Sequence, residues 1–160
     1  MKGYYKKPEE TAKTMDSQGW LHTGDLGLID PKTRYLKFTG RFKDMLRVGG
    51  ENVSAMEVES FLLTHPKVKQ AQVIGVPDPR LTEVGMAFLE LKEGAAVSED
   101  EILTYCRGKI ANFKVPRYVV FVKEFPLTGS GKIQKFKLKE EALRKLQIKG
   151  QTQTKGSKKP

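Results

Sequence analysis

The chain has 160 residues, a net charge of +10 and 30% charged residues. This length suits one core, or one domain with part of another, and excludes a large multidomain enzyme. No apolar stretch approaches a membrane span, and the first ten residues lack the apolar segment of a secretory signal, so we expect a cytoplasmic location. The single cysteine, Cys106, excludes an internal disulfide, and we expect it to be a small buried residue.

The positive charge is concentrated near the C-terminus. Between residues 132 and 160, nine Lys and one Arg stand against two Glu, a net charge of +8. Residues 148–160 contain four Lys and no aromatic residue, whereas surfaces that bind nucleic acid combine the two kinds. We therefore predict a basic disordered tail over 148–160, and a module that binds nucleic acid or anionic surfaces is the alternative.

The first forty residues predict a β-hairpin. Residues 19–30 and 34–41 have strand character and are joined by the turn sequence Asp-Pro-Lys-Thr. A single hairpin has no core of its own, so this portion is expected to pack against something else.

The following hundred residues predict a compact α+β domain, in which helices pack on a small mixed sheet behind a front β-hairpin. Gly49 and Gly50 form the turn of that hairpin. Ser54 and Ser98 each stand three residues before a Glu, a capping-box pattern that predicts the start of a helix. The predicted strands are 45–48, 51–53, 68–80, 83–94 and 118–122. The predicted helical stripes are Val58, Phe61 and Leu62; Ile102, Leu103, Cys106 and Ile110; and Leu138, Ala142 and Leu146.

The loop before the last helix reads "PLTGSGKIQK", residues 126–135, and raises the question of what Lys132 does. Glycines followed by a lysine suggest a phosphate-binding loop. The P-loop spacing, however, requires glycine where Pro126 stands and a hydroxyl residue where Ile133 stands. The sequence therefore excludes a P-loop.

Three stretches occur in a fixed order: "GWLHTGD", "GRFKDMLRVGGENVSAMEVE" and "PLTGSGKIQK". Together they resemble signature motifs of the adenylate-forming superfamily, and most of all its acyl-CoA synthetase branch. The resemblance covers the chain up to about residue 147. It implies activation of a carboxylate with ATP to an acyl-adenylate, followed by transfer of the acyl group to coenzyme A.

The resemblance also divides the chain into parts. Residues 1–42 would be the last strands of a large N-terminal domain, and residues 43–147 the C-terminal lid domain. The rest of the large domain is then a missing partner, and the isolated chain is expected to be inactive. A luciferase-like lid or a peptide-synthetase adenylation lid are the alternatives, and the acyl substrate stays open.

By resemblance, five positions have roles besides Lys132. Asp25 would bind the ribose hydroxyls of ATP, and Arg41 would lie near the ribose and phosphates. Lys43 would be the hinge between the two domains. Gly49 and Gly50 would line the pantetheine tunnel after the lid rotates.

Lys132 would be the catalytic residue, bridging the acyl carboxylate and the α-phosphate during adenylate formation. Its loop also resembles the pattern that lysine acetyltransferases modify in such synthetases. ATP with Mg²⁺ and coenzyme A would be substrates, with no tightly bound cofactor. We expect no metal site in this chain, because His22 and His65 lack neighbours at metal-ligand spacing.

Overall fold

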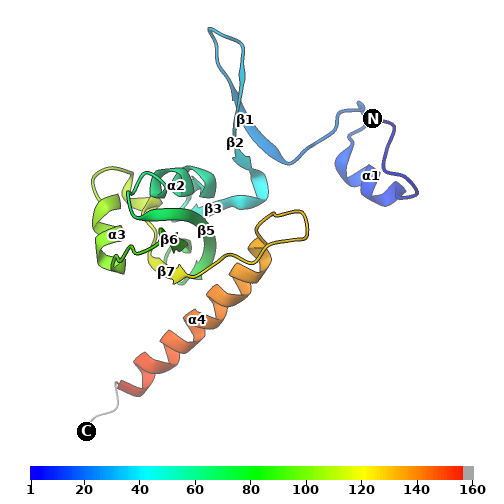
Figure 1. Ribbon diagram of the computed structural model, residues 1–160. Coiled ribbons are helices and arrows are strands. Elements are labelled where there is room, and N and C mark those ends of the chain that lie inside the picture. The colour runs from blue at the N-terminus through cyan, green and yellow to red at the C-terminus, as the bar shows by residue number, and fades with distance from the viewer. Residues whose placement is uncertain (157–160) are drawn as a thin grey trace. The chain divides into compact units, whose positions relative to one another are not determined.

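The computed structural model describes the backbone of residues 1–156 and the side chains of residues 1–147 (Figure 1). Contacts within the chain separate two compact units, Met1–Lys43 and Asp44–Pro160. This division falls one residue after the boundary predicted between residues 42 and 43. The assignment of the first unit to a larger domain stays a prediction.

The first unit contains the predicted hairpin, in which β1 (Asp25–Ile29) pairs antiparallel with β2 (Leu36–Arg41). Asp30 starts the turn, and its carboxylate accepts the backbone amides of Lys32 and Thr33 at 2.9 and 2.7 Å. An aspartate that bonds the amides two and three residues ahead stabilises a tight turn. The turn chemistry read from the sequence is therefore confirmed.

Two features of the first unit differ from prediction. β1 begins at Asp25 instead of residue 19, because Gly19 and Gly24 have φ angles of +84° and +75°, which interrupt an extended strand. A short helix, α1 (Pro8–Thr14), was not predicted. Its proline at the first turn and its early glutamates are helix-start signals that could have indicated it.

The second unit is built on one mixed five-stranded sheet, which confirms the predicted fold class. β6 is central and pairs antiparallel with β5 and β3, and parallel with β7, while β4 pairs with β3. The strands are β3 (Met45–Val48), β4 (Glu51–Ser54), β5 (Val68–Asp78), β6 (Thr82–Leu91) and β7 (Tyr118–Val122).

Both predicted capping boxes begin a helix. Ser54 precedes α2 (Ala55–Leu62), and Ser98 precedes α3 (Glu99–Cys106). Each serine hydroxyl accepts the backbone amide three residues ahead, at 3.3 and 3.1 Å respectively. This bond satisfies one of the amides that a helix start leaves without a partner inside the helix.

α3 ends earlier than predicted. We expected Ile110 to continue its apolar stripe, but the helix stops at Cys106. Gly108 has a φ angle of +74°, the left-handed conformation that commonly ends helices. Ile110 still packs against the core from the loop that follows.

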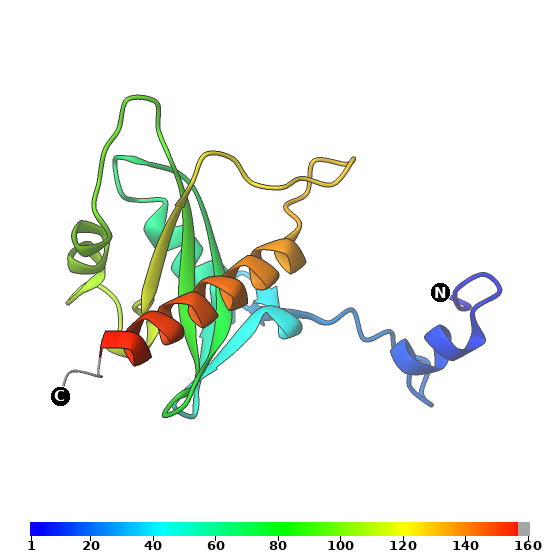
Figure 2. The ribbon, with the colours of Figure 1, turned by 90° about the horizontal axis from the view of Figure 1, so that it is seen from below.

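Helices cover both faces of the sheet (Figure 2). On one face Ala87 and Leu89 of β6 pack with residues of α2 and α3. On the other face Met86 and Phe88 pack with the last helix, α4 (Lys135–Gly156). Adjacent residues of a strand point to opposite faces, so β6 is buried on both.

α4 carries the predicted apolar stripe, with Leu138 and Ala142 buried. Its backbone continues to Gly156, into the segment predicted as a disordered tail. Side chains from residue 148 onwards, and residues 157–160 altogether, lie outside the described residues. The tail over 148–160 stays a prediction.

Candidate functional site

The Lys132 loop, residues 126–134, is closed by its own hydrogen bonds. The amide of Thr128 donates to the carbonyl of Lys132 at 2.7 Å, and the amide of Lys132 donates to the hydroxyl of Thr128 at 3.1 Å. Leu127 and Ile133 form an isolated β-bridge below this turn. Gly131, with a φ angle of +77°, reverses the chain at the tip. The loop is thus a small hairpin that holds Lys132 at an exposed position.

The ammonium group of Lys132 has no ion-pair partner among the side chains of residues 1–147. A β-carbon added at Gly129 or Gly131 would meet no atom within 4 Å. The tip of the loop is therefore surrounded by open space, and the positive charge of Lys132 is unpaired within residues 1–147.

The base of the loop has an ionic network that sequence reasoning missed. The Nζ atom of Lys135 lies 3.3 Å from Asp44 Oδ2 and 3.2 Å from Glu59 Oε1. The same Glu59 oxygen accepts the backbone amide of Val73 at 2.9 Å. Glu59 lies on the buried side of α2, beside Val58. This position was the feature of the sequence that could have indicated the ionic network. A carboxylate on an apolar stripe requires partners.

The turn between β3 and β4 is formed by Gly49 and Gly50, with φ angles of +58° and +92°. The amide of Gly49 donates to the carbonyl of Leu81, at 2.8 Å, in the turn between β5 and β6. That second turn is held by Asp78, whose carboxylate accepts the amides of Arg80 and Leu81, both at 2.9 Å. These bonds hold the pKa of Asp78 below its usual value.

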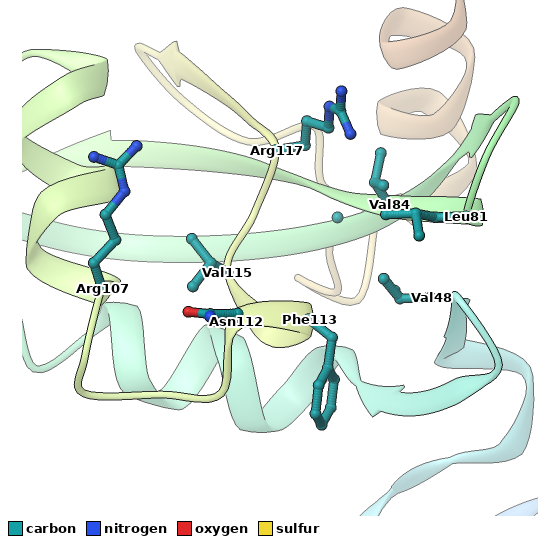
Figure 3. Close-up of a pocket in the computed structure, with 9 residues that line it drawn as sticks. Val48, Leu81, Val84, Arg107, Asn112, Phe113, Val115 and Arg117 are labelled. Carbon is teal, nitrogen blue, oxygen red and sulfur yellow. The ribbon is translucent and has the colours of Figure 1, made fainter.

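A pocket of about 270 Å³ opens beside the two turns (Figure 3). Its walls are mainly apolar, and Arg107 and Arg117 bring two positive charges to it. Arg117 is held by Asp78, with an Nη1–Oδ2 distance of 3.5 Å. The lining residues are Val48, Leu81, Val84, Gly85, Arg107, Asn112, Phe113, Val115 and Arg117. This chemistry suits a ligand that has an apolar part and anionic groups, and no motif in the sequence indicated the pocket.

Asp25 and Arg41 are cross-strand partners in the first unit. Arg41 Nε lies 3.3 Å from Asp25 Oδ1, and both side chains are about half exposed. Thr23 accepts the amide of Asp25 at 3.1 Å, which fixes the start of β1. The structure therefore brings the two predicted nucleotide-binding residues together.

Lys43 lies in a single 3₁₀ turn, η1 (Phe42–Asp44), and its side chain is exposed. The division between the two units falls directly after it. The amide of Phe42 donates to Gly24 of the first unit, while Asp44 pairs with Lys135 of the second. Lys43 thus stands between two anchored residues, and its hinge role stays a prediction.

Lys132 and the glycine turn do not lie together. Figure 2 shows the turns joining β3 to β4 and β5 to β6 at one end of the sheet, and the Lys132 loop away from that end. Hydrogen bonding agrees, because Gly49, at the end of β3, contacts Leu81, whereas Asp44, before the start of β3, contacts Lys135. The Lys132 loop and the Gly49–Gly50 turn are therefore two separate elements of the second unit.

The two histidines and the cysteine considered in the sequence analysis lie in surroundings that fit structural roles. His65 is buried, and Cys106 is a buried thiol whose pKa is raised by that burial. His22 pairs with Asp16 at 3.2 Å on the surface. Within the described residues, no three His, Cys, Asp or Glu side chains are grouped so as to hold a metal ion. None of the described helices has the length and apolarity to cross a membrane.

Comparison with known proteins identifies the family. Residues 57–132 match the family model of the AMP-binding enzyme C-terminal domain. The matched residues belong to this family. The match begins in α2 and ends at Lys132, so it includes β5, β6, β7, α3 and most of the Lys132 loop, whereas β3 and β4 precede it.

The similarity to individual relatives extends into the first unit. YngI of Bacillus subtilis, named as an acyl-CoA synthetase, is 51% identical over 143 residues, which are 89% of this chain and 26% of YngI. The medium-chain acyl-CoA ligase ACSF2 of Mus musculus is 47% identical over 148 residues, 92% of this chain and 24% of ACSF2. The relatives are acyl-CoA synthetases, which confirms the predicted resemblance.

Solved structures agree on the fold. The ATP-bound MatB of Rhodopseudomonas palustris has a TM-score of 0.81 and 38% identity, covering 88% of this chain and 28% of MatB. The chain therefore spans about a quarter of the length of the curated relatives it matches. In these relatives the domain is part of a longer polypeptide.

Proposed function

We propose that this chain is the C-terminal lid portion of an ATP-dependent, AMP-forming acyl-CoA synthetase. The observation that carries the proposal is the separation of the Lys132 loop from the Gly49–Gly50 turn within one domain. One orientation of the lid would present Lys132 to the substrates, and rotation about Lys43 would present the glycine turn. Such an exchange lets one domain serve two successive half-reactions.

In the first half-reaction, Lys132 stabilises the charge that develops between the acyl carboxylate and the α-phosphate. Its exposure and the absence of an ion-pair partner within residues 1–147 support this role, since the ammonium is available to a ligand. A point charge on a flexible stem gains most from a developing charge in a site that excludes water. The hydrogen bonds that close the hairpin limit the movement of the loop tip that carries Lys132.

Asp25 and Arg41 bind the nucleotide in the same half-reaction. A carboxylate accepts hydrogen bonds from two ribose hydroxyls, and a guanidinium donates to ribose or phosphate oxygens. Their mutual pairing orients both groups before ATP arrives. ATP with Mg²⁺ is the substrate, and no tightly bound cofactor is required of these residues.

In the second half-reaction, coenzyme A approaches past Gly50. No atom lies within 4 Å of a β-carbon built at this glycine, so a thin chain can pass close to the backbone. The adjacent pocket supports the same assignment, because Arg107 and Arg117 suit the phosphates of coenzyme A and the apolar walls suit its adenine.

The acceptor has one competing assignment. The amide bond synthetase McbA of Marinactinospora thermotolerans has a TM-score of 0.79 and 37% identity to this chain. An enzyme of that kind passes the activated acyl group to an amine instead of a thiol. The experiment must therefore identify the acceptor of the acyl group. It must also distinguish an acyl-CoA synthetase lid or an amide-forming lid from a luciferase-like or peptide-synthetase lid.

The test uses two proteins. One is the 160-residue chain alone, and the other is an "ACSF2 fusion", in which this chain replaces the matching C-terminal part of mouse ACSF2. With ATP, Mg²⁺, coenzyme A and medium-chain fatty acids, we expect AMP and acyl-CoA from the fusion and none from the chain alone. A fusion that is inactive beside active ACSF2, or turnover by the chain alone, would contradict the proposal. Replacing coenzyme A with an amine identifies the acceptor.

Two further predictions accompany this function. Acetylation of Lys132 removes the charge on which adenylation depends, and the exposure of the loop leaves the ammonium accessible to an acetyltransferase. The cytoplasmic location remains a prediction from the sequence alone.

A further inference from the structure

Within the described residues, the tip of the Lys132 loop has no hydrogen bond to the rest of its unit, and the loop is attached near its base, where Ile133 packs against the core. The bonds within the loop join its own residues, such as Thr128 with Lys132. They keep the hairpin folded but do not fix the direction in which it projects. That direction depends on what holds the two ends, which are the buried Phe125 on one side and Ile133 with Lys135 on the other.

Lys135 is the first residue of α4 and follows Lys132 by three positions. Its side chain is 33% exposed, and its ammonium is shared between Glu59 and Asp44. The Glu59 side chain is only 11% exposed, and one of its oxygens already holds the edge of the sheet through Val73. The Glu59 contact therefore anchors Lys135 to a fixed point of the sheet and α2.

The second contact reaches the boundary between the two units. Asp44 is the first residue of the second unit, directly after the proposed hinge residue Lys43. The ion pair between Asp44 and Lys135 joins residues 91 positions apart in the sequence. It links the start of β3 to the start of α4, so one ammonium connects the boundary, the sheet and the loop base.

We propose that Lys135 is a positioning residue for Lys132. Because Lys135 binds both Asp44 and Glu59, the loop moves together with the first residue after the hinge. Rotation of the lid then places Lys132 in a defined position. The inference rests on the proposed role of Lys132 in adenylation. It assigns Lys135 no contact with substrate.

The chain offers a matched control. Lys137 lies two residues further along α4, is exposed, and has no ion-pair partner within residues 1–147. Lys137→Met removes the same charge from the same helix without touching the network. Lys135→Met leaves two carboxylates that shared one cation, whereas Lys135→Arg keeps a cation able to bind both.

Activity is measured in the ACSF2 fusion, with adenylation and thioester formation assayed separately. We expect Lys135→Met to lower the adenylation kcat by about 10- to 100-fold, because small displacements of a catalytic group have effects of this size. Thioester formation from supplied acyl-adenylate should be largely retained, Lys135→Arg should restore most of the adenylation, and Lys137→Met should resemble the unchanged fusion. Equal loss of both half-reactions, or equal behaviour of the two Met variants, would overturn the inference.

A second readout does not depend on activity. In the 160-residue chain, NMR relaxation should show greater motion of residues 127–134 in Lys135→Met than in Lys137→Met, with the hydrogen bond from the Lys132 amide to the Thr128 hydroxyl retained. An unchanged loop would also overturn the inference. If Lys132→Ala leaves adenylation intact, the proposed function fails. If Lys132→Ala abolishes adenylation and Lys135→Met does not, only the positioning role fails.

Discussion

Asp25 and Arg41 face each other at the open end of the β1–β2 hairpin, with 3.3 Å between Oδ1 and Nε. Both side chains are about half exposed, and exposed ion pairs contribute at most about 1 kcal/mol to stability. The pair is therefore poorly explained by folding alone, whereas its remaining donor and acceptor atoms, which have no ion-pair partner among the side chains of residues 1–147, can meet a polar ligand.

Asp25→Ala tests this in the ACSF2 fusion. Loss of hydrogen bonds to a carboxylate should lower kcat/KM for ATP by about 10- to 100-fold. In the 160-residue chain the same change should lower the free energy of unfolding by less than about 1 kcal/mol. Lys37→Ala, an exposed change on β2, is the control and should alter neither quantity. An unchanged kcat/KM for ATP in Asp25→Ala would remove the nucleotide role.

Gly50→Leu should slow thioester formation while leaving adenylation largely intact. Its φ angle of +92° makes any side chain strained, at a cost of about 1 to 3 kcal/mol in the free energy of unfolding. Gly94→Leu is the matched control, because Gly94 also has a positive φ angle, +71°, and no atom within 4 Å of a built β-carbon. Similar kinetics for the two variants would show that strain, not the path of coenzyme A, explains the effect.

Arg117→Ala should raise the KM for coenzyme A about tenfold, as expected for the loss of one charge-assisted hydrogen bond. The adenylation rate should not change, since Arg117 belongs to the pocket beside the glycine turn and not to the Lys132 loop. Arg144→Ala, on the exposed side of α4, removes the same charge elsewhere. If both variants have the same KM for coenzyme A, the pocket has no part in its binding.

The burial of His65 leads us to predict that the stability of the chain depends on pH. Burial lowers the pKa of His65 from 6.5; Glu101 opposes this shift, and Lys67 and Lys109 reinforce it. The Nδ1 atom of His65 also accepts the amide of Lys67 at 3.3 Å, which requires a neutral ring. The folded state thus favours neutral His65, so its contribution is complete above pH 6.5 and is lost as the pH falls through the lowered pKa.

Urea denaturation of the 160-residue chain measures this contribution. Between about pH 7 and about pH 5 the free energy of unfolding should decrease, and His65→Gln should flatten that decrease. His22→Gln, a change at the exposed histidine, serves as the control and should leave the slope as it was. A slope that does not respond to His65→Gln would contradict the prediction.

Local chemistry in the sequence predicted much of the fold. Ser54 and Ser98 cap their helices as expected, and Gly49 and Gly50 make the predicted turn, because each depends on neighbours within a few residues. The end of α3 was misplaced because an apolar residue at helical spacing, Ile110, packs just as well from a loop.

The site was predictable only where motifs carried it. Lys132 could be recognised from the glycines around it. The proposed role of Lys135, in contrast, depends on its ion pair with Asp44, which lies 91 residues earlier in the sequence. The pocket likewise combines residues that follow α3 with residues of two distant turns. Such groupings arise from the sheet order, which no local pattern in one sequence encodes.

The most direct test of the rotating-lid account is Lys132→Ala in the ACSF2 fusion, with the two half-reactions measured separately. The account predicts that acyl-dependent exchange of pyrophosphate into ATP falls by about 100-fold or more, while thioester formation from supplied acyl-adenylate is largely retained. If both half-reactions survive equally, Lys132 is an ordinary surface lysine and the account is wrong.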